Sequence, residues 1–335
     1  MLHIPLMLAA LAAAQSPRFD TDTTVSVSQG SRLRLQNQGG DITIRTWDRS
    51  QIRIQAEHSS RASVQVDTRG QAVEISARGR GMGLATVVDY QLTVPTWMAL
   101  DVGGMYAEIS IDGTRAPVKA QTLEGNITLK GGADQVTLTT VNGFIDVTGA
   151  RGRVHLNSVS EDVRVTDLEG ELIVEAVAGD VDLRRISARS VDAQTVSGDV
   201  TFEGRLADGG SYLFTSHSGD VTLAVAEGSN ATINVASANG DVSTSFDLRS
   251  ERQSRRRQSY RLGSGSATVD VETYSGDLSI IRPSELRPRR EADAERKGER
   301  EDDADEERLE RRLEAKFKKL ERGERDHDRQ GEIER

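Results

Sequence analysis

The stretch Thr195-Val-Ser-Gly-Asp-Val-Thr-Phe202 is one of a series of similar phrases along the chain. Each phrase holds a small polar residue, then Gly-Asp or a variant, then two apolar residues separated by a polar one. The intervals between the glycine positions are 18, 18, 18, 18, 19, 21, 21 and 36 residues. This position, called the corner position below, falls at Ala107, Gly125, Gly143, Glu161, Gly179, Gly198, Gly219, Gly240 and Gly276. A nearly fixed period predicts a stacked repeat architecture rather than a globular enzyme.

Apolar and polar residues alternate on both sides of the corner position. Apolar residues lie two and four residues after it, as at Ile127 and Leu129, and seven and five residues before it, as at Val118 and Ala120. Such alternation indicates strands with one buried face. We therefore predict an all-β fold, a parallel β-solenoid with two strands per coil of about 18 residues. Its coils would stack about 4.8 Å apart, with two sheets facing each other across a thin apolar core.

The chain divides into an apolar N-terminus and three further regions. Alternating segments over residues 19–102 predict an N-terminal β region that caps the stack, and residues 103–282 hold the repeats. The 36-residue interval indicates a coil that carries a basic insertion at residues 247–266. Residues 285–335 form a charge-dense tail, which we expect to be helical or disordered. Apolar residues at helical spacing make this tail a candidate to bind a partner helix: Leu309, Leu313, Phe317 and Leu320.

Residues 1–14 are predicted to form a secretory signal peptide. They are mostly apolar and end in Ala12-Ala-Ala14, which is typical of a cleavage site. The run is too short to cross about 30 Å of hydrocarbon as a helix, and no other segment is apolar enough to do so. The mature chain is therefore expected to be exported, either to the periplasm or to the cell surface.

Composition excludes several classes of function. A net charge of −10 and a pI of about 5.2 argue against nucleic-acid binding, which normally needs a basic face. The chain has no cysteine, so neither a disulfide framework nor a thiolate metal site is available. No cofactor is expected.

The Gly-Asp pair has two interpretations. Stacked carboxylates repel one another unless a cation bridges them, which would make the pair a calcium ladder. Alternatively, glycine supplies a positive φ in a tight turn and aspartate accepts backbone N–H groups. We favour the turn, because Asn126 and Phe144 occupy the aspartate position without a charge. The predicted structural turn ladder comprises Gly125, Gly143, Gly179, Asp180, Gly198, Asp199, Gly219, Asp220, Gly240, Asp241, Gly276 and Asp277.

No catalytic residue is assigned. Hydroxyl residues three positions before the corner are expected to face inward and bond the backbone. The run from Ser216 through His217 to Asp220 is not a triad, because alternate residues of a strand point to opposite faces. The outward residues Asp146, Arg164 and Asp182 form either a cross-strand charge ladder or part of a polysaccharide-active site.

The basic insertion contains a candidate anion contact at Arg255, Arg256 and Arg257. These side chains are suited to anionic polysaccharide or lipid headgroups. Acidic groups of the chain itself are an equally good partner, so both interpretations stay open.

The chain resembles the bacterial DUF4097 family of adhesin-like proteins, related to the head domains of DUF2807, over about residues 20–282. The resemblance rests on Val88-Asp-Tyr-Gln-Leu-Thr-Val-Pro95, on the serial S-G-D-V and N-G-D-V phrases, and on Leu262-Gly-Ser-Gly-Ser266 with Thr273-Tyr-Ser-Gly-Asp-Leu278. It implies a β-solenoid without catalytic residues. We expect an exported, non-enzymatic binding or scaffold surface in the cell envelope, whose partner is an envelope protein or a polysaccharide. The alternative is a polysaccharide-active lyase or hydrolase.

Overall fold

The structure, a computed structural model, describes residues 20–79, 86–253 and 258–286. The chain divides into a unit of residues Met1–Ser284 and a second unit of residues Glu285–Arg335. The predicted signal peptide and the predicted tail beyond Leu286 lie outside the described residues. The fold is that of the first unit.

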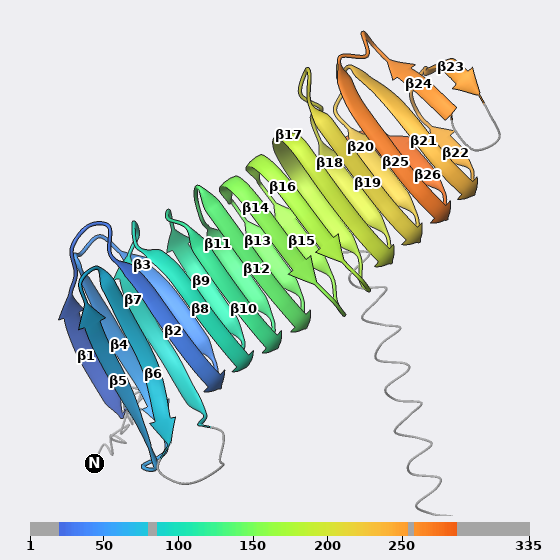
Figure 1. Ribbon diagram of the computed structural model, residues 1–335. Helices are drawn as coiled ribbons and strands as arrows, with labels where there is room; N and C mark the ends of the chain where they lie inside the picture. Colours follow the sequence, from blue (N-terminus) through green and yellow to red (C-terminus); the bar gives the residue numbers. More distant parts are fainter. Residues whose placement is uncertain (1–19, 80–85, 254–257, 287–335) are drawn as a thin grey trace, which may run out of the picture. The chain divides into compact units, whose positions relative to one another are not determined.

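The strands form two sheets wound into one flattened solenoid (Figure 1). From one end of the stack to the other, sheet A consists of β1 (Thr21–Ser26), β4 (Gln51–His58), β7 (Val88–Pro95), β3 (Ile42–Trp47), β9 (Ile109–Thr114), β11 (Ile127–Gly131), β13 (Ile145–Thr148), β15 (Val163–Thr166), β17 (Val181–Ser197), β18 (Val200–Gly204), β20 (Val221–Val225), β26 (Leu278–Ile281) and β22 (Val242–Thr244).

Sheet B faces sheet A and shares β17 with it. In the same direction it consists of β5 (Ala62–Arg69), β6 (Ala72–Gly79), β2 (Arg32–Gly39), β8 (Ala99–Tyr106), β10 (Val118–Glu124), β12 (Gln135–Asn142), β14 (Arg151–Ser158), β16 (Glu169–Ala176), β17, β19 (Ser211–Ser218), β25 (Ala267–Ser275), β21 (Ala231–Asn239), β24 (Gln258–Leu262) and β23 (Arg249–Gln253). A short 3-10 helix, η1 (Pro283–Glu285), follows β26.

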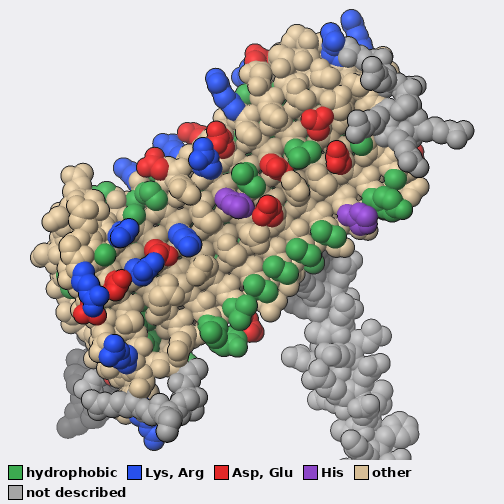
Figure 2. Space-filling view, in the orientation of Figure 1, with side chains coloured by type: hydrophobic (Ala, Val, Ile, Leu, Met, Phe, Trp, Pro, Cys, Tyr) green, Lys and Arg blue, Asp and Glu red, His purple; other side chains and the backbone are tan. Residues whose placement is uncertain are grey.

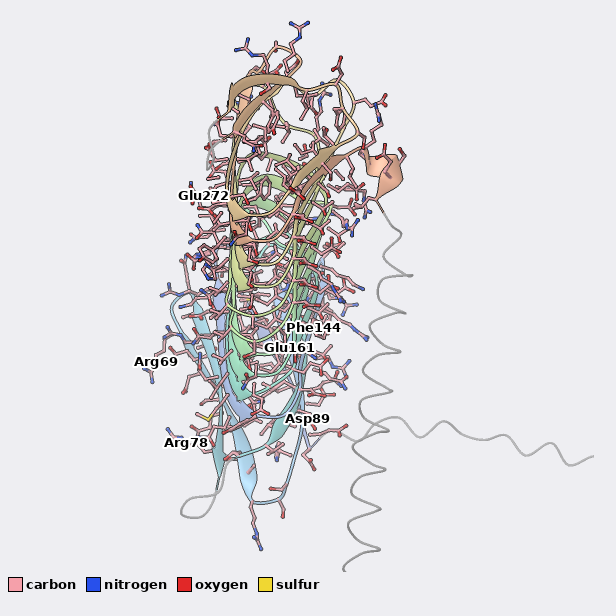
Figure 3. All side chains as sticks on the ribbon, turned by 90° about the vertical axis from the view of Figure 1, so that its right-hand side faces the viewer. Arg69, Arg78, Asp89, Phe144, Glu161 and Glu272 are labelled. Atoms are coloured by element: carbon pink, nitrogen blue, oxygen red, sulfur yellow. The ribbon has the colours of Figure 1, made fainter. Side chains whose placement is uncertain are left out.

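The predicted alternation builds the core between the two sheets. Val118 of β10 lies opposite Val136 of β12, and Ile127 of β11 lies opposite Ile145 of β13, both in parallel register. These four side chains are buried. Figure 3 shows the two sheets facing each other, with Arg69 and Glu272 on one side of the molecule and Asp89 and Phe144 on the other. The predicted all-β parallel solenoid is confirmed.

At the N-terminal end, the order of coils in the stack differs from their order in the chain. The coil β2–β3 lies between β6–β7 and β8–β9, and pairs in parallel with both. The solenoid therefore begins at Arg32 and not at the expected residue 103, which falls inside β8. The antiparallel strands β1, β4 and β5 are the parts of residues 19–102 that cap the stack.

The C-terminal end shows the same interleaving. The coil β25–β26 lies between β19–β20 and β21–β22, although it follows both in the chain. The hairpin β23–β24 lies within the insertion predicted at residues 247–266, whereas the position of this coil in the stack was not predicted. Along the chain, the outermost coil β21–β22 comes first and the antiparallel hairpin β23–β24 follows it. The coil β25–β26 comes last and lies between β19–β20 and β21–β22.

Candidate functional site: the repeat corner and its apolar ridge

The corner position lies where each coil turns from sheet B to sheet A. A Cβ at Gly125 would lie 2.7 Å from the carbonyl carbon of Ala107 in the preceding coil. The preceding coil therefore leaves no room for a side chain at Gly125. Most corner glycines also have a positive φ, for example +136° at Gly125, whereas Gly240 does not. At Gly240 a Cβ would collide with the carbonyl oxygen of Gly276, so close packing alone requires glycine there.

The residue after the corner forms a hydrogen-bonded ladder between coils. The backbone N–H of one coil donates to the side-chain oxygen of its neighbour: Phe144 to Asn126 (3.1 Å), Asp180 to Asp162 (3.0 Å), Asp199 to Asp180 (2.8 Å), Asp220 to Asp199 (2.9 Å), Asp277 to Asp220 (2.8 Å) and Asp241 to Asp277 (2.9 Å). The ladder follows the order of the stack, since Asp277 comes between Asp220 and Asp241. The aspartates thus bond the neighbouring turn, and within the described ranges no group of His, Asp or Glu is arranged to hold a metal ion.

The hydroxyl row three residues before the corner is buried. Five hydroxyls of the row donate to the corner carbonyl of the preceding coil: Thr122 to Ala107 (3.1 Å), Thr140 to Gly125 (3.1 Å), Ser158 to Gly143 (3.5 Å), Thr195 to Gly179 (3.2 Å) and Ser216 to Gly198 (3.0 Å). The buried hydroxyls of Ser237 and Thr273 have no hydrogen-bond partner in the described structure. Ser216 is 1% exposed, so its Oγ is not available to a substrate.

The other sequence candidates are placed as follows. His217 points outward and stacks on Tyr274 rather than bonding Ser216. Asp146, Arg164 and Asp182 lie directly opposite one another on β13, β15 and β17, as in a cross-strand ladder. The candidate anion contact at Arg255, Arg256 and Arg257 lies outside the described residues and stays a prediction.

The structure shows an exposed apolar row that the sequence reasoning missed. Two residues before the corner, where outward positions are expected to be polar, an apolar side chain recurs in coil after coil. This apolar ridge consists of Met105, Leu123, Val141, Val159, Val177 and Val196. Met105, Leu123, Val177 and Val196 are 46–50% exposed, and Val141 and Val159 are half-buried. The sequence did contain a signal for this row: the alternation of inward and outward residues places this position on the outward face, yet apolar residues occupy it.

The apolar ridge runs along one long edge of the molecule (Figure 2). Six coils at the usual strand spacing give it a length of about 24 Å. Single exposed apolar residues are ordinary, but a continuous row of them marks a surface suited to a partner.

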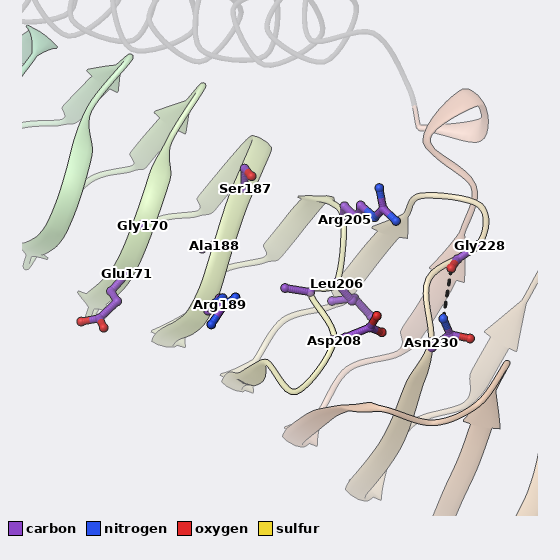
Figure 4. A pocket seen from close by; sticks show the side chains of 11 residues that line it. Gly170, Glu171, Ser187, Ala188, Arg189, Arg205, Leu206, Asp208, Gly228 and Asn230 are labelled. Atoms are coloured by element: carbon purple, nitrogen blue, oxygen red, sulfur yellow. Dashed lines mark hydrogen bonds between the residues drawn. The ribbon is translucent and has the colours of Figure 1, made fainter.

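On the opposite side, the turns of variable length enclose a cavity of about 620 Å³. Charged side chains of both signs line it: Glu171, Arg189, Arg205 and Asp208 (Figure 4). Glu171 pairs with Arg153 (3.0 Å), and Asp208 accepts a hydrogen bond from Ser266.

A second cavity, of about 850 Å³, lies where the line of the ridge reaches the C-terminal coils. Strands β19, β25 and β21 supply its walls, including His217, Glu272 and Tyr274. The rings of His217 and Tyr274 stack with centroids 5.0 Å apart and planes within 10°. We call this the end cavity.

Tyrosine hydroxyls inside the solenoid are held in the neutral form. Burial raises the pKa of Tyr90 and of Tyr212 above the ordinary tyrosine value. Tyr212 Oη donates to the Ala188 carbonyl (2.7 Å) and accepts from the Ala207 N–H (2.8 Å). These hydroxyls belong to the core and not to a surface site.

No helix in the described ranges combines the length and the apolar character needed to cross a membrane.

Comparison with known proteins gives matches to solved structures and to one family. A "putative adhesin" from Bacteroides fragilis has 11% identity and a TM-score of 0.38, over 79% of this chain and 98% of its own. A "putative adhesin" from Parabacteroides merdae has 10% identity and a TM-score of 0.32, over 78% of this chain and 95% of its own. No curated protein matches the chain. The Toastrack DUF4097 family matches residues 31–281, which is most of the chain, and the protein therefore belongs to this family.

Proposed function

We propose that this protein is an exported, non-enzymatic β-solenoid that serves as an adhesin-like binding or scaffold surface in the cell envelope. The observation that carries the proposal is the apolar ridge. It leaves a row of apolar side chains in water, which is costly unless a partner covers them. The partner we expect is an envelope protein or a polysaccharide.

The rest of the repeat corner supports this division of roles. The aspartates, hydroxyls and glycines bond or contact neighbouring coils, so they maintain the stack. The apolar ridge projects outward from the same corner, and four of its six side chains are about half exposed. A rigid backbone thus presents the ridge in a fixed line, which lowers the entropy cost of binding.

Binding of purified mature protein to isolated cell envelopes tests the proposal. We expect the triple variant Leu123→Ser, Val177→Ser, Val196→Ser to bind at least about tenfold more weakly, because each substitution removes about 1 kcal/mol of apolar burial. The matched control is Gln121→Ser, Glu175→Ser, Gln194→Ser, which changes the outward residues two positions earlier in the chain. Thermal melts of both variants check that the solenoid remains folded. Equal binding by the two triple variants would contradict the proposal.

Export is tested separately by cell fractionation. The support for export is the sequence pattern of residues 1–14. We expect the full-length chain in the periplasm or at the cell surface, and a chain lacking Met1–Ala14 in the cytoplasm. Retention of the full-length chain in the cytoplasm would overturn the localisation.

A further inference from the structure

The end cavity owes its shape to three strands of sheet B that lie side by side. Thr215 of β19, Glu272 of β25 and Ala236 of β21 are directly opposite one another. All three belong to the outward face of the sheet and line the cavity. The alanine is the smallest of the three, so the sheet surface falls away beyond β25 and forms a floor.

An aromatic face is left open above this floor. His217 stacks against one face of the Tyr274 ring. On the other side of Tyr274 the next coil supplies Ala238, which carries no ring to cover the second face. Tyr274 is 57% exposed. The two-ring stack therefore has room for a third flat group.

A carboxylate lies beside the open ring face. Glu272 precedes Tyr274 by two residues on the same strand, so both side chains point outward. Within the described part of the chain Glu272 makes no hydrogen bond or ion pair. No lysine or arginine is among the residues described as lining the cavity.

We propose that the end cavity binds the guanidinium group of an arginine-bearing peptide. A planar cation stacks on the open face of Tyr274, since an aromatic ring attracts a cation placed over its face. The same group forms paired hydrogen bonds to the Glu272 carboxylate, which matches the guanidinium fork. A neutral sugar would leave the charge of Glu272 unused, and an anionic ligand would be repelled by it.

This inference deepens the proposed binding role by naming a partner class at the end of the ridge, and it rests on that role. Its residues are separate from Leu123, Val177 and Val196. Failure of the wild-type protein to bind the peptide, while it still binds envelopes, would therefore overturn this inference alone. Equal envelope binding by the two triple variants would overturn the role of the ridge, whatever the result with the peptide.

The test uses acetyl-Gly-Arg-Gly-amide and its citrulline counterpart, which has the same shape but no charge. NMR of protein labelled at alanine methyl groups follows the signals of Ala236 and Ala238. We expect the arginine peptide to shift both signals, and the citrulline peptide to bind about tenfold more weakly. Equal binding of the two peptides, or a stronger response to a neutral disaccharide than to the arginine peptide, would overturn the proposal.

Substitutions locate the binding groups. Tyr274→Ala should weaken peptide binding about two- to fivefold, as expected for an exposed cation–aromatic contact, while Tyr274→Phe keeps the ring face and binding within twofold. Glu272→Gln should weaken binding about two- to fivefold. Glu175→Gln, an outward carboxylate on β16, is the matched control and should change nothing. A Tyr274→Ala protein that is folded by thermal melt and binds like wild type would contradict the site.

Discussion

At the corners that hold glycine, close approach of the neighbouring coil excludes a side chain. A Cβ at Gly219 would collide with the carbonyl oxygen of Gly198 in the coil beneath. Gly228, in a variable turn, also has a positive φ of +80°, but a Cβ there would meet no atom within 4 Å. The two positions separate the cost of close coil packing from the cost of backbone conformation.

We predict that Gly219→Ala lowers the free energy of unfolding much more than Gly228→Ala. Both variants place a Cβ at a positive φ, +152° at Gly219 and +80° at Gly228, which costs about 1–3 kcal/mol. Gly219→Ala must in addition push two coils apart, which adds about 2 kcal/mol or more. Urea denaturation measures both changes. Equal losses in the two variants would show that the corner is not closely packed.

The aspartate ladder gives a second prediction at this scale. Asp220 donates its N–H to Asp199 and accepts from Asp277 through Oδ1. Asparagine can keep that acceptor, as Asn126 does for Phe144, so Asp220→Asn should leave stability unchanged or slightly higher. Asp220→Ala should cost about 1 kcal/mol. Thermal melts with calcium and with EDTA complete the test. A loss in Asp220→Asn as large as in Asp220→Ala, together with a calcium-dependent midpoint, would favour a bound cation.

Among the elements, β7 and β19 each bury a tyrosine, but in different surroundings. The hydroxyl of Tyr212 of β19 forms hydrogen bonds with the backbone of Ala188 and of Ala207. Its ring packs against the Phe202 ring, with the two ring centroids 6.0 Å apart. Tyr90 of β7 has a buried hydroxyl without a hydrogen-bond partner in the described structure. Its ring contributes to the core, but its hydroxyl is buried at a cost.

Substitution by phenylalanine should therefore have opposite effects at the two sites. Tyr212→Phe leaves the Ala188 carbonyl and the Ala207 N–H without this partner, and should cost about 1–3 kcal/mol. Tyr90→Phe removes an unpaired hydroxyl and should leave stability equal or higher. Denaturation at pH 7 measures both. A destabilised Tyr90→Phe variant would indicate a partner for that hydroxyl.

The same hydroxyls predict a dependence of stability on alkaline pH. Burial raises their pKa in the folded state, whereas the unfolded value is about 10. The contribution of the two neutral hydroxyls to the free energy of unfolding is therefore fully present below about pH 10. It is lost as the pH rises from the unfolded pKa toward the folded pKa. The double variant Tyr90→Phe, Tyr212→Phe should lose less stability than wild type between pH 9 and 11. Parallel declines in wild type and variant would contradict this assignment.

Strand content was predictable because burial follows parity. Ile127, Leu129, Val118 and Ala120 were expected to face inward from their spacing alone, and all four are buried. The apolar ridge was not predicted, because at the corner an outward apolar residue looks like part of the adjacent core pattern. The binding partner of the ridge is a separate molecule, so no pattern in this sequence identifies it.

For the whole molecule, the least predictable feature is the order of the coils. Every coil offers the same alternating apolar face, so the period predicts how many coils exist but not which are neighbours. The interleaved coils β2–β3 and β25–β26 depend on pairings between distant segments. The hairpin β23–β24, which returns the chain to the gap, was visible in the sequence only as part of a basic insertion.

The interleaving also creates the end cavity. His217 and Tyr274 stack because β25 lies directly beside β19. If the coils followed chain order, Ala238 would separate the two rings, and Glu272 would face a different neighbour. The end cavity therefore exists only if the coils stack in this interleaved order.

Cysteine cross-linking tests this order most directly, and the natural chain has no cysteine to interfere. Thr215 and Glu272 lie on adjacent strands, about 4.8 Å apart, whereas Thr215 and Ala236 are separated by two strand spacings. Disulfides need Cα atoms closer than about 7 Å. On mild oxidation we predict a disulfide in Thr215→Cys, Glu272→Cys and none in Thr215→Cys, Ala236→Cys. A disulfide only in the second pair would contradict the interleaved solenoid and, with it, the end cavity.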